Sequence, residues 1–212
     1  MSIANDARFR DRTSQRYARG LIADQVAYER TLNRTRDLLA SSDSVLELGC
    51  GTGTTALRLA GHVKEYLATD ISAGMIAIAN ERHVGEPIPA LAFHTATVET
   101  LPPDAKAFNA VLGFNYLHLV RDLPATLRHI HVLLAAEGVF ISKTPCVGNM
   151  NPLIRLALVP AMRAIGIAPY AGVFREAELI QLISAAGFEI IVTESHATKG
   201  NDNRPYIVAR KR

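Results

Sequence analysis

The strongest constraint on the fold is a buried-strand pattern that runs into three alternating glycines. The segment reads Val45-Leu46-Glu47-Leu48-Gly49-Cys50-Gly51-Thr52-Gly53-Thr54, and a helix is expected to follow over residues 54–60. Glycine permits positive φ and close approach to the backbone, and the start of a helix presents free N–H groups. The order of strand, glycine loop and helix therefore predicts an α/β fold with an anionic or adenine-bearing ligand at the loop.

A second expected strand supports a nucleotide-like ligand. Tyr66-Leu67-Ala68-Thr69 ends in Asp70, seventeen residues after Gly53. A carboxylate at the tip of that strand can accept hydrogen bonds from both hydroxyls of a ribose. A dinucleotide site would need glycine where Thr54 stands, so the spacing disfavours a nicotinamide-dependent oxidoreductase, although that class shares the layout.

The loop resembles that of the class I (Rossmann-like) S-adenosylmethionine-dependent methyltransferases, whose pattern is acid-x-G-x-G-x-G. Here the pattern is Glu47-x-Gly49-x-Gly51-x-Gly53. The resemblance extends over further segments: residues 70–76, 97–102 after an expected third strand at 91–96, strands at 108–114 and 138–142, a helical pattern at 121–134, and 185–190 ahead of the sixth strand. It implies a single domain over residues 1–212, built as a three-layer sandwich. Its seven-stranded sheet would be mostly parallel, with an antiparallel last strand at 205–209.

The resemblance also implies how S-adenosylmethionine binds. Asp70 would hold the ribose, and the glycine loop would wrap the methionine part. Relatives use an aspartate for the adenine amino group where this chain has Thr97, so the Thr97 hydroxyl, Glu99 or the backbone could make that contact. An N-terminal aromatic residue often touches the methionine end, which makes Tyr17 the candidate and Tyr28 the reserve. The expected cofactor residues are Tyr17, Glu47, Gly49, Cys50, Gly51, Gly53, Asp70, Ile71, Met75, Thr97, Val98 and Asn115.

The candidate catalytic residue is His118, in Asn115-Tyr116-Leu117-His118 after the fourth strand. Relatives line the methyl-transfer site there, and an imidazole titrates in the range useful to a general base. A cofactor-side or packing role is the alternative. Tyr116 and Tyr170 are candidate substrate contacts. Cys146 is expected to be a buried structural cysteine rather than a nucleophile, and no metal site is expected, because no paired-acid arrangement is recognisable.

Two segments extend the minimal fold. Residues 1–40 are expected to form an N-terminal helical cap, with an imperfectly amphipathic helix over 21–40. Residues 146–174 form a long apolar insertion that would overhang the crevice as a lid, excluding water and favouring a small apolar or aromatic substrate. An extra core layer, a dimer contact or a membrane-surface contact is the alternative. In the last case Arg155 and Arg163 could meet lipid phosphates.

Composition narrows the classes of function. The chain has 212 residues, of which 49% are hydrophobic, so it can bury a core without disulfides or metals. The net charge of +3 is scattered apart from the arginines of residues 8–19 and the basic end at 210–212, both interpreted as solvated termini. No nucleic-acid module, secretory signal or membrane span is recognisable. A cytoplasmic monomer or homodimer is therefore expected.

The sequence thus predicts an enzyme that transfers a methyl group from S-adenosylmethionine to a small, apolar or aromatic molecule and releases S-adenosylhomocysteine. N-methylation of a phospholipid or other lipid headgroup at a membrane surface is the alternative. An NAD-dependent oxidoreductase and a non-catalytic S-adenosylmethionine-binding protein are disfavoured alternatives.

Overall fold

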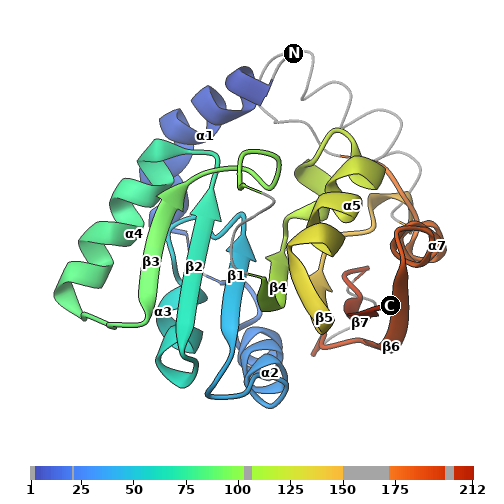
Figure 1. The fold of residues 1–212 in the computed structure, drawn as a ribbon. Helices are drawn as coiled ribbons and strands as arrows, with labels where there is room; N and C mark the ends of the chain where they lie inside the picture. The colour runs from blue at the N-terminus through green and yellow to red at the C-terminus, as the bar shows by residue number, and fades with distance from the viewer. Residues whose placement is uncertain (1–2, 21, 103–106, 150–171, 199–202) are drawn as a thin grey trace.

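The computed structural model describes residues 3–20, 22–102, 107–149, 172–198 and 203–212. These residues contain a seven-stranded sheet of order β3-β2-β1-β4-β5-β7-β6 (Figure 1). The strands are β1 (Ser44–Leu48), β2 (Glu65–Asp70), β3 (Leu91–Thr95), β4 (Phe108–Phe114), β5 (Leu134–Lys143), β6 (Phe188–Glu194) and β7 (Tyr206–Lys211). β7 runs antiparallel to β5 and β6, and the other pairings are parallel. The predicted fold class is confirmed.

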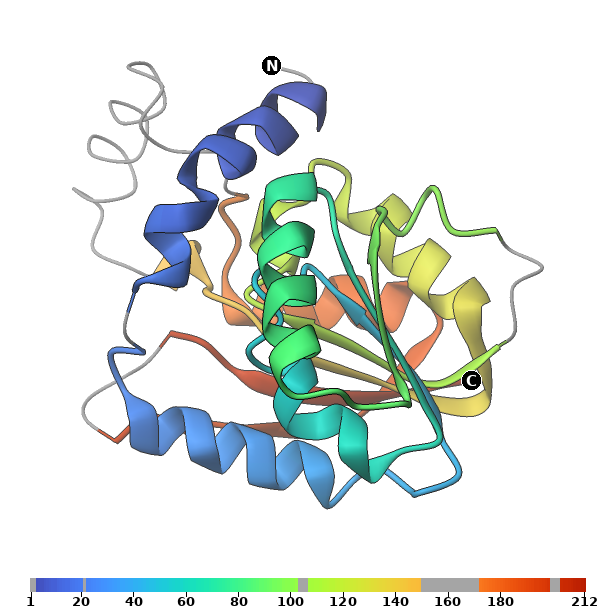
Figure 2. The same ribbon diagram turned by 90° about the vertical axis from the view of Figure 1, so that its left-hand side faces the viewer.

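Helices cover both faces of the sheet (Figures 1 and 2). The helices are α1 (Ile3–Ala18), α2 (Gln25–Arg36), α3 (Ala56–Leu59), α4 (Ala73–Gly85), α5 (Leu123–Leu133) and α7 (Glu176–Ala185), with short 3-10 turns η1 (Ala60–His62), η2 (Leu117–Leu119) and η3 (Val147–Asn149). One apolar core cluster joins the sheet to α5 and α7. A second joins it to α2, α3 and α4, which completes three layers.

The sheet topology places the candidate site. Strand order reverses between β1 and β4, the point where open α/β sheets bind ligands beyond the carboxyl ends of their strands. All five residues of the central strand β1 are buried, as expected for a parallel strand covered on both faces. The loops after β1, β2 and β4 therefore meet at one edge of the sheet.

The N-terminal region differs from the predicted single helix over 21–40. α2 begins later because the Asp24 side chain caps it, accepting a hydrogen bond from the Ala27 N–H at 2.9 Å. A second helix, α1, precedes it within the helical cap expected over residues 1–40, although no separate helix was predicted there. The helix after the glycine loop is also shorter than expected, since it begins at Ala56. Phe188 already lies in β6, so residues 185–190 overlap the sixth strand rather than precede it.

Most of the predicted insertion at 146–174 lies outside the described residues, and so do Tyr170, Arg155 and Arg163. Its described ends meet beside η2. The Gly148 N–H donates to the Phe174 carbonyl at 2.9 Å, and the Gly172 N–H donates to the His118 carbonyl at 2.6 Å. In the part of the chain that the structure describes, no helix is both long enough and apolar enough to cross a bilayer.

Candidate active site

The glycine loop after β1 adopts the conformation that its sequence predicts. Gly49, Gly51 and Gly53 have φ values of 69°, 56° and 77°, a region that side chains disfavour. Close packing adds to the requirement. A Cβ on Gly49 would lie 2.8 Å from Cδ2 of Tyr116, and one on Gly53 would lie 2.7 Å from Cζ of Phe93. The loop backbone therefore packs directly against aromatic side chains at the edge of the sheet.

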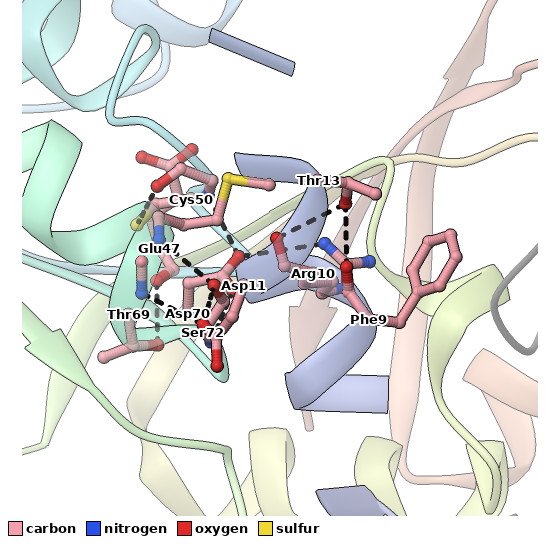
Figure 3. Close-up of polar contacts among 12 residues, drawn as sticks. Phe9, Arg10, Asp11, Thr13, Glu47, Cys50, Thr69, Asp70 and Ser72 are labelled. Atoms are coloured by element: carbon pink, nitrogen blue, oxygen red, sulfur yellow. Dashed lines mark hydrogen bonds and ion pairs between the residues drawn. The ribbon is translucent and has the colours of Figure 1, made fainter. Parts of the chain in front are cut away.

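Asp70 joins the end of β2 to this loop (Figure 3). Its side chain is 1% exposed. Oδ2 accepts a hydrogen bond from the Gly51 N–H at 3.1 Å, and Oδ1 accepts one from the Ser72 N–H at 2.9 Å. The predicted ribose acid is thus held against the predicted methionine loop. Ile71 follows it directly, and Met75 is buried in the first turn of α4.

Two further predicted cofactor residues, Glu47 in β1 and Cys50 in the loop itself, are buried. The Glu47 side chain is 3% exposed and accepts a hydrogen bond from the Tyr66 hydroxyl at 2.8 Å. Burial, together with the charge of Asp70, raises the pKa of Glu47 to about 7. Burial, with the charge of Glu47, also raises the pKa of the Cys50 thiol, which keeps it protonated. Both side chains are buried, and their contact with the cofactor stays a prediction.

Helix α1 packs over this edge of the sheet against α4 (Figures 2 and 3). Oδ1 of Asp11 accepts hydrogen bonds from the Ser72 hydroxyl at 2.6 Å and from the Gly74 N–H at 3.0 Å, at the start of α4. Tyr17 is 62% exposed, but its Cε1 lies 3.5 Å from where a Gly51 Cβ would be. The predicted methionine-end aromatic therefore lies beside the loop.

Arg10 and Arg82 are site residues that sequence reasoning missed. Arg10, interpreted as part of a solvated arginine cluster, has a side chain only 20% exposed, and its Nη1 lies 4.0 Å from Oδ2 of Asp70. The Arg82 guanidinium donates to the Thr52 carbonyl and hydroxyl and the Thr54 hydroxyl, and to the Ala18 carbonyl at the end of α1, at 2.9–3.1 Å. No local pattern identifies either residue, because their partners are distant in the sequence.

The segment after β4, which was predicted to line the site of the methyl acceptor, lies against the glycine loop. Asn115 has a φ of 51°, and its N–H donates to the Lys143 carbonyl at 2.8 Å. This turn sets the Tyr116 ring against Gly49, and burial raises the pKa of the Tyr116 hydroxyl. Tyr116 therefore lies between the glycine loop and the turn that carries His118.

His118 is mostly buried, and its Nδ1 has no hydrogen-bond partner among the described residues. Burial, together with the charges of Arg10 and Arg204, lowers its pKa to about 4. The prediction that this imidazole titrates near neutral pH is wrong for this structure. The ring is neutral across the physiological range, because ionisation would place a cation among arginines in a desolvated site.

The remaining predicted residues lie after β3 and β5. The Thr97 N–H bonds to the Thr100 hydroxyl at 2.9 Å, and Val98 is buried in the core. Glu99 accepts from the Thr126 hydroxyl at 3.2 Å, which directs it toward α5. Which of these groups reads the adenine stays a prediction. The Cys146 side chain is buried, and burial raises its pKa to about 12, which disfavours a nucleophilic thiolate.

Comparisons with known proteins agree with this geometry. A family described as "Methyltransferase domain" matches residues 15–193, more than half of the chain. The chain is 31% identical over 168 residues to the protein named "Arginine-hydroxylase NDUFAF5, mitochondrial" of Danio rerio, covering 78% of this chain and 51% of that protein. For the human protein of the same name, identity is 28% over 175 residues, covering 81% and 49%. The chain thus spans about half the length of these relatives.

Solved structures share the fold. Magnesium protoporphyrin IX methyltransferase (ChlM) from Synechocystis PCC 6803 with bound SAH has a TM-score of 0.74 and 17% identity, covering 98% of this chain and all of that one (100%). A possible histamine N-methyltransferase from Thermotoga maritima has a TM-score of 0.71 and 23% identity, covering 97% and 99%. Because the family match extends over most of the chain and the sheet has the strand order that the loop predicted, the chain belongs to the methyltransferase domain family, with the Rossmann-like fold of the S-adenosylmethionine-dependent enzymes.

Proposed function

We propose that the protein binds S-adenosylmethionine at the glycine loop and transfers its methyl group to a small acceptor with an apolar or aromatic body. The observation that supports this most is the junction of Asp70 with the loop. A carboxylate at the end of β2 accepts from the Gly51 N–H, while Gly49 packs on the Tyr116 ring that follows β4. The expected ribose acid, methionine loop and acceptor side therefore share one edge of the sheet.

The residues present fit the cofactor. A Cβ on Gly49 would enter the space of the Tyr116 ring, so glycine is what allows that ring to pack directly on the loop expected to hold the methionine part. When bound, the cofactor supplies a methyl group on a sulfonium, which is already a good electrophile. The protein then needs mainly to align the acceptor and exclude water.

His118 contributes as a neutral hydrogen-bond acceptor. Its Nδ1 is buried without a hydrogen-bond partner among the described residues, and an acceptor hydroxyl or amine that enters the site would supply that partner. With a pKa of about 4 it is a weak base, so it orients the acceptor and takes the proton only as the new bond develops positive charge. The insertion at 146–174 is proposed as the lid over this side. Its described ends meet beside His118, where the Gly172 N–H bonds to the His118 carbonyl.

Hydroxylation is the second candidate reaction, because the curated relatives are named arginine-hydroxylase and are up to 31% identical over most of this chain. It would consume dioxygen and two electrons from an external reductant, with one oxygen atom entering the product and the other leaving as water. The mass of the product distinguishes the two reactions. Methyl transfer replaces a hydrogen of the acceptor by a methyl group, a net gain of CH2, whereas hydroxylation gives a net gain of one oxygen atom. Methyl transfer also releases S-adenosylhomocysteine in equal amount. A lipid-headgroup acceptor would be recognised by turnover only in the presence of phospholipid vesicles.

Cofactor binding by an Asp70→Asn variant tests the proposal. The substitution keeps the shape of the side chain but removes the charge that would hold the ribose. The affinity for S-adenosylhomocysteine, measured by calorimetry, is expected to fall by about tenfold to a hundredfold. Asp43→Asn is the matched control, since Asp43 caps a turn at the Ala40 N–H before β1. Unchanged affinity in the Asp70 variant would contradict the assigned site.

A further inference from the structure

Helix α1 carries a row of exposed arginines. Arg8, Arg12 and Arg16 lie on the helix, and Arg19 directly follows its last residue. Spacings of four, four and three residues bring the four side chains to one side of the helix, within an arc of about 80°. Ser14, the buried residue of α1, lies about 120–160° away from each of them. The four arginines therefore form a basic face that points away from the packed side of α1.

The charge of the basic face is not neutralised by the described residues, since none of them forms an ion pair with it. The Arg8 guanidinium donates a hydrogen bond to the neutral side chain of Asn5. Both acids of α1 are engaged elsewhere, Asp6 with Arg121 and Asp11 with the start of α4. The chain has a net charge of +3 and the basic face supplies four positive charges, so the other residues together carry −1. The excess positive charge of the chain is thus no larger than that of this one face.

The shape of the basic face suits a flat anionic surface. The outer side of a single helix is convex, and from Arg8 to Arg19 it extends about 16 Å. A convex row of guanidinium groups can meet several phosphates of a bilayer at once, whereas a nucleic-acid strand is generally held in a positively charged groove. Four or more basic residues on one helix are typical of binding to anionic lipids.

Exposed apolar side chains in the same segment also favour a bilayer over a nucleic acid. Of the eight exposed large hydrophobic residues among the described ones, four belong to residues 3–26 and are each at least 40% exposed: Ile3, Tyr17, Ile22 and Val26. Aliphatic side chains find no partner on a phosphate backbone, but they gain free energy by entering the interfacial region of a bilayer.

We propose that the basic face of α1 docks the protein on the surface of an anionic phospholipid bilayer. The docking itself does not depend on the reaction. Because α1 packs over the edge of the sheet that carries the glycine loop, docking would hold the candidate active site close to the bilayer (Figure 2). Under the proposed function, an acceptor with an apolar body could then reach the site from the bilayer.

Co-sedimentation with vesicles, without any cofactor, tests the docking. Vesicles of phosphatidylcholine alone are compared with vesicles that contain about one-third phosphatidylserine. The wild type is expected to bind the anionic vesicles at least about a hundredfold more tightly at low salt, because each arginine near such a surface contributes about fivefold. Raising the ionic strength to about 0.5 M should remove most of this preference, because salt screens the charges.

Two charge-matched variants locate the docking surface. The basic-face variant, Arg12→Gln/Arg16→Gln/Arg19→Gln, should bind anionic vesicles about a hundredfold more weakly than the wild type. A control variant removes the same charge from exposed positions on other parts of the chain: Lys64→Gln, Arg128→Gln and Arg212→Gln. The control should stay within about threefold of the wild type, because its missing charges are not on the docking surface. All six side chains are exposed, so both variants are expected to fold.

A fluorescent label reports which side of the molecule meets the bilayer. Both native cysteines are buried, so one introduced cysteine can carry an environment-sensitive dye. A dye on Gln15→Cys, an exposed position beside the basic face, should shift its emission to shorter wavelength when anionic vesicles are added. A dye on Val132→Cys, an exposed position on α5, should not change.

Three outcomes overturn the inference. Equal binding to neutral and anionic vesicles, or no binding to either, would remove its electrostatic basis. An equal loss in the basic-face and control variants would show that net charge alone drives the binding. Tighter binding to a single-stranded oligonucleotide than to anionic vesicles, abolished in the basic-face variant, would assign the face to nucleic acid instead.

Discussion

Replacing Glu47 with glutamine is expected to change how the stability of the protein depends on pH. Glu47 is buried in β1, and its carboxyl accepts a hydrogen bond from the Tyr66 hydroxyl. Burial raises its pKa from an ordinary value of 4.5 to about 7, and the charge of Asp70 contributes. Glutamine has nearly the same shape, keeps an oxygen for Tyr66 and cannot ionise.

Because the pKa of Glu47 is higher in the folded state, the wild-type protein should lose stability as the pH rises. The folded state favours the protonated carboxyl, so the contribution of Glu47 to stability is complete below about pH 4.5. It declines as pH rises and is lost above about pH 7. The shift from 4.5 to about 7 corresponds to about 3 kcal/mol in total, and to about 2–3 kcal/mol between about pH 5 and about pH 8. The glutamine variant lacks this decline.

Urea denaturation of both proteins over that range measures the effect. The free energy of unfolding of Glu47→Gln, relative to the wild type, should rise by about 2–3 kcal/mol from about pH 5 to about pH 8. A buried amide N–H₂ without a partner destabilises the variant by about 1–3 kcal/mol at every pH, so the change with pH carries the test. A difference that stays constant with pH would refute the reasoning.

Four further results are expected. Gly53→Ala should lower the free energy of unfolding in urea by about 2–5 kcal/mol, because residue 53 has a φ of 77° and a Cβ there would meet Phe93. Gly61→Ala is the control, because its Cβ enters open space and should have little effect. Equal effects of the two substitutions would contradict this account. Arg82→Met removes the hydrogen bonds that join the loop to the end of α1, and should lower stability by about 2 kcal/mol, or about 4–8 °C in thermal midpoint. It should also weaken the binding of S-adenosylhomocysteine. Unchanged affinity in calorimetry would argue against a role of Arg82 in holding the loop. Cys146→Ala should retain turnover because the thiol stays protonated, and a covalent adduct in the mass spectrum would disprove it. NMR of labelled histidine should find His118 neutral above about pH 5, and titration near neutrality would contradict its buried, arginine-flanked setting.

The sheet and the loop could be predicted because their signals are local. The apolar run of β4 has the predicted limits of 108–114, and the alternating glycines predict positive φ directly. β5 begins earlier than expected, at Leu134, because its pairing with β4 continues through a register shift near Phe108. Such an irregularity depends on the partner strand, which the local sequence does not specify.

The contacts that complete the site could not be predicted, because they join distant parts of the chain. The buried residue of α1 is the polar Ser14, and Asp11 holds the helix through the Ser72 hydroxyl, 61 residues away in sequence. In the sequence, Arg10 belongs to a cluster of arginines that is typical of a solvated surface. Only the folded structure brings its side chain close to Asp70. The lowered pKa of His118 likewise depends on burial and on arginines from both ends of the chain.

The most direct test of the central claim is the thermal midpoint of the purified protein with S-adenosylhomocysteine, S-adenosylmethionine and NADH in parallel. A ligand that binds only the native state stabilises it, by about 3 kcal/mol at a hundred times its Kd. The account predicts a rise with the first two ligands and none with NADH. A rise with NADH alone would contradict it.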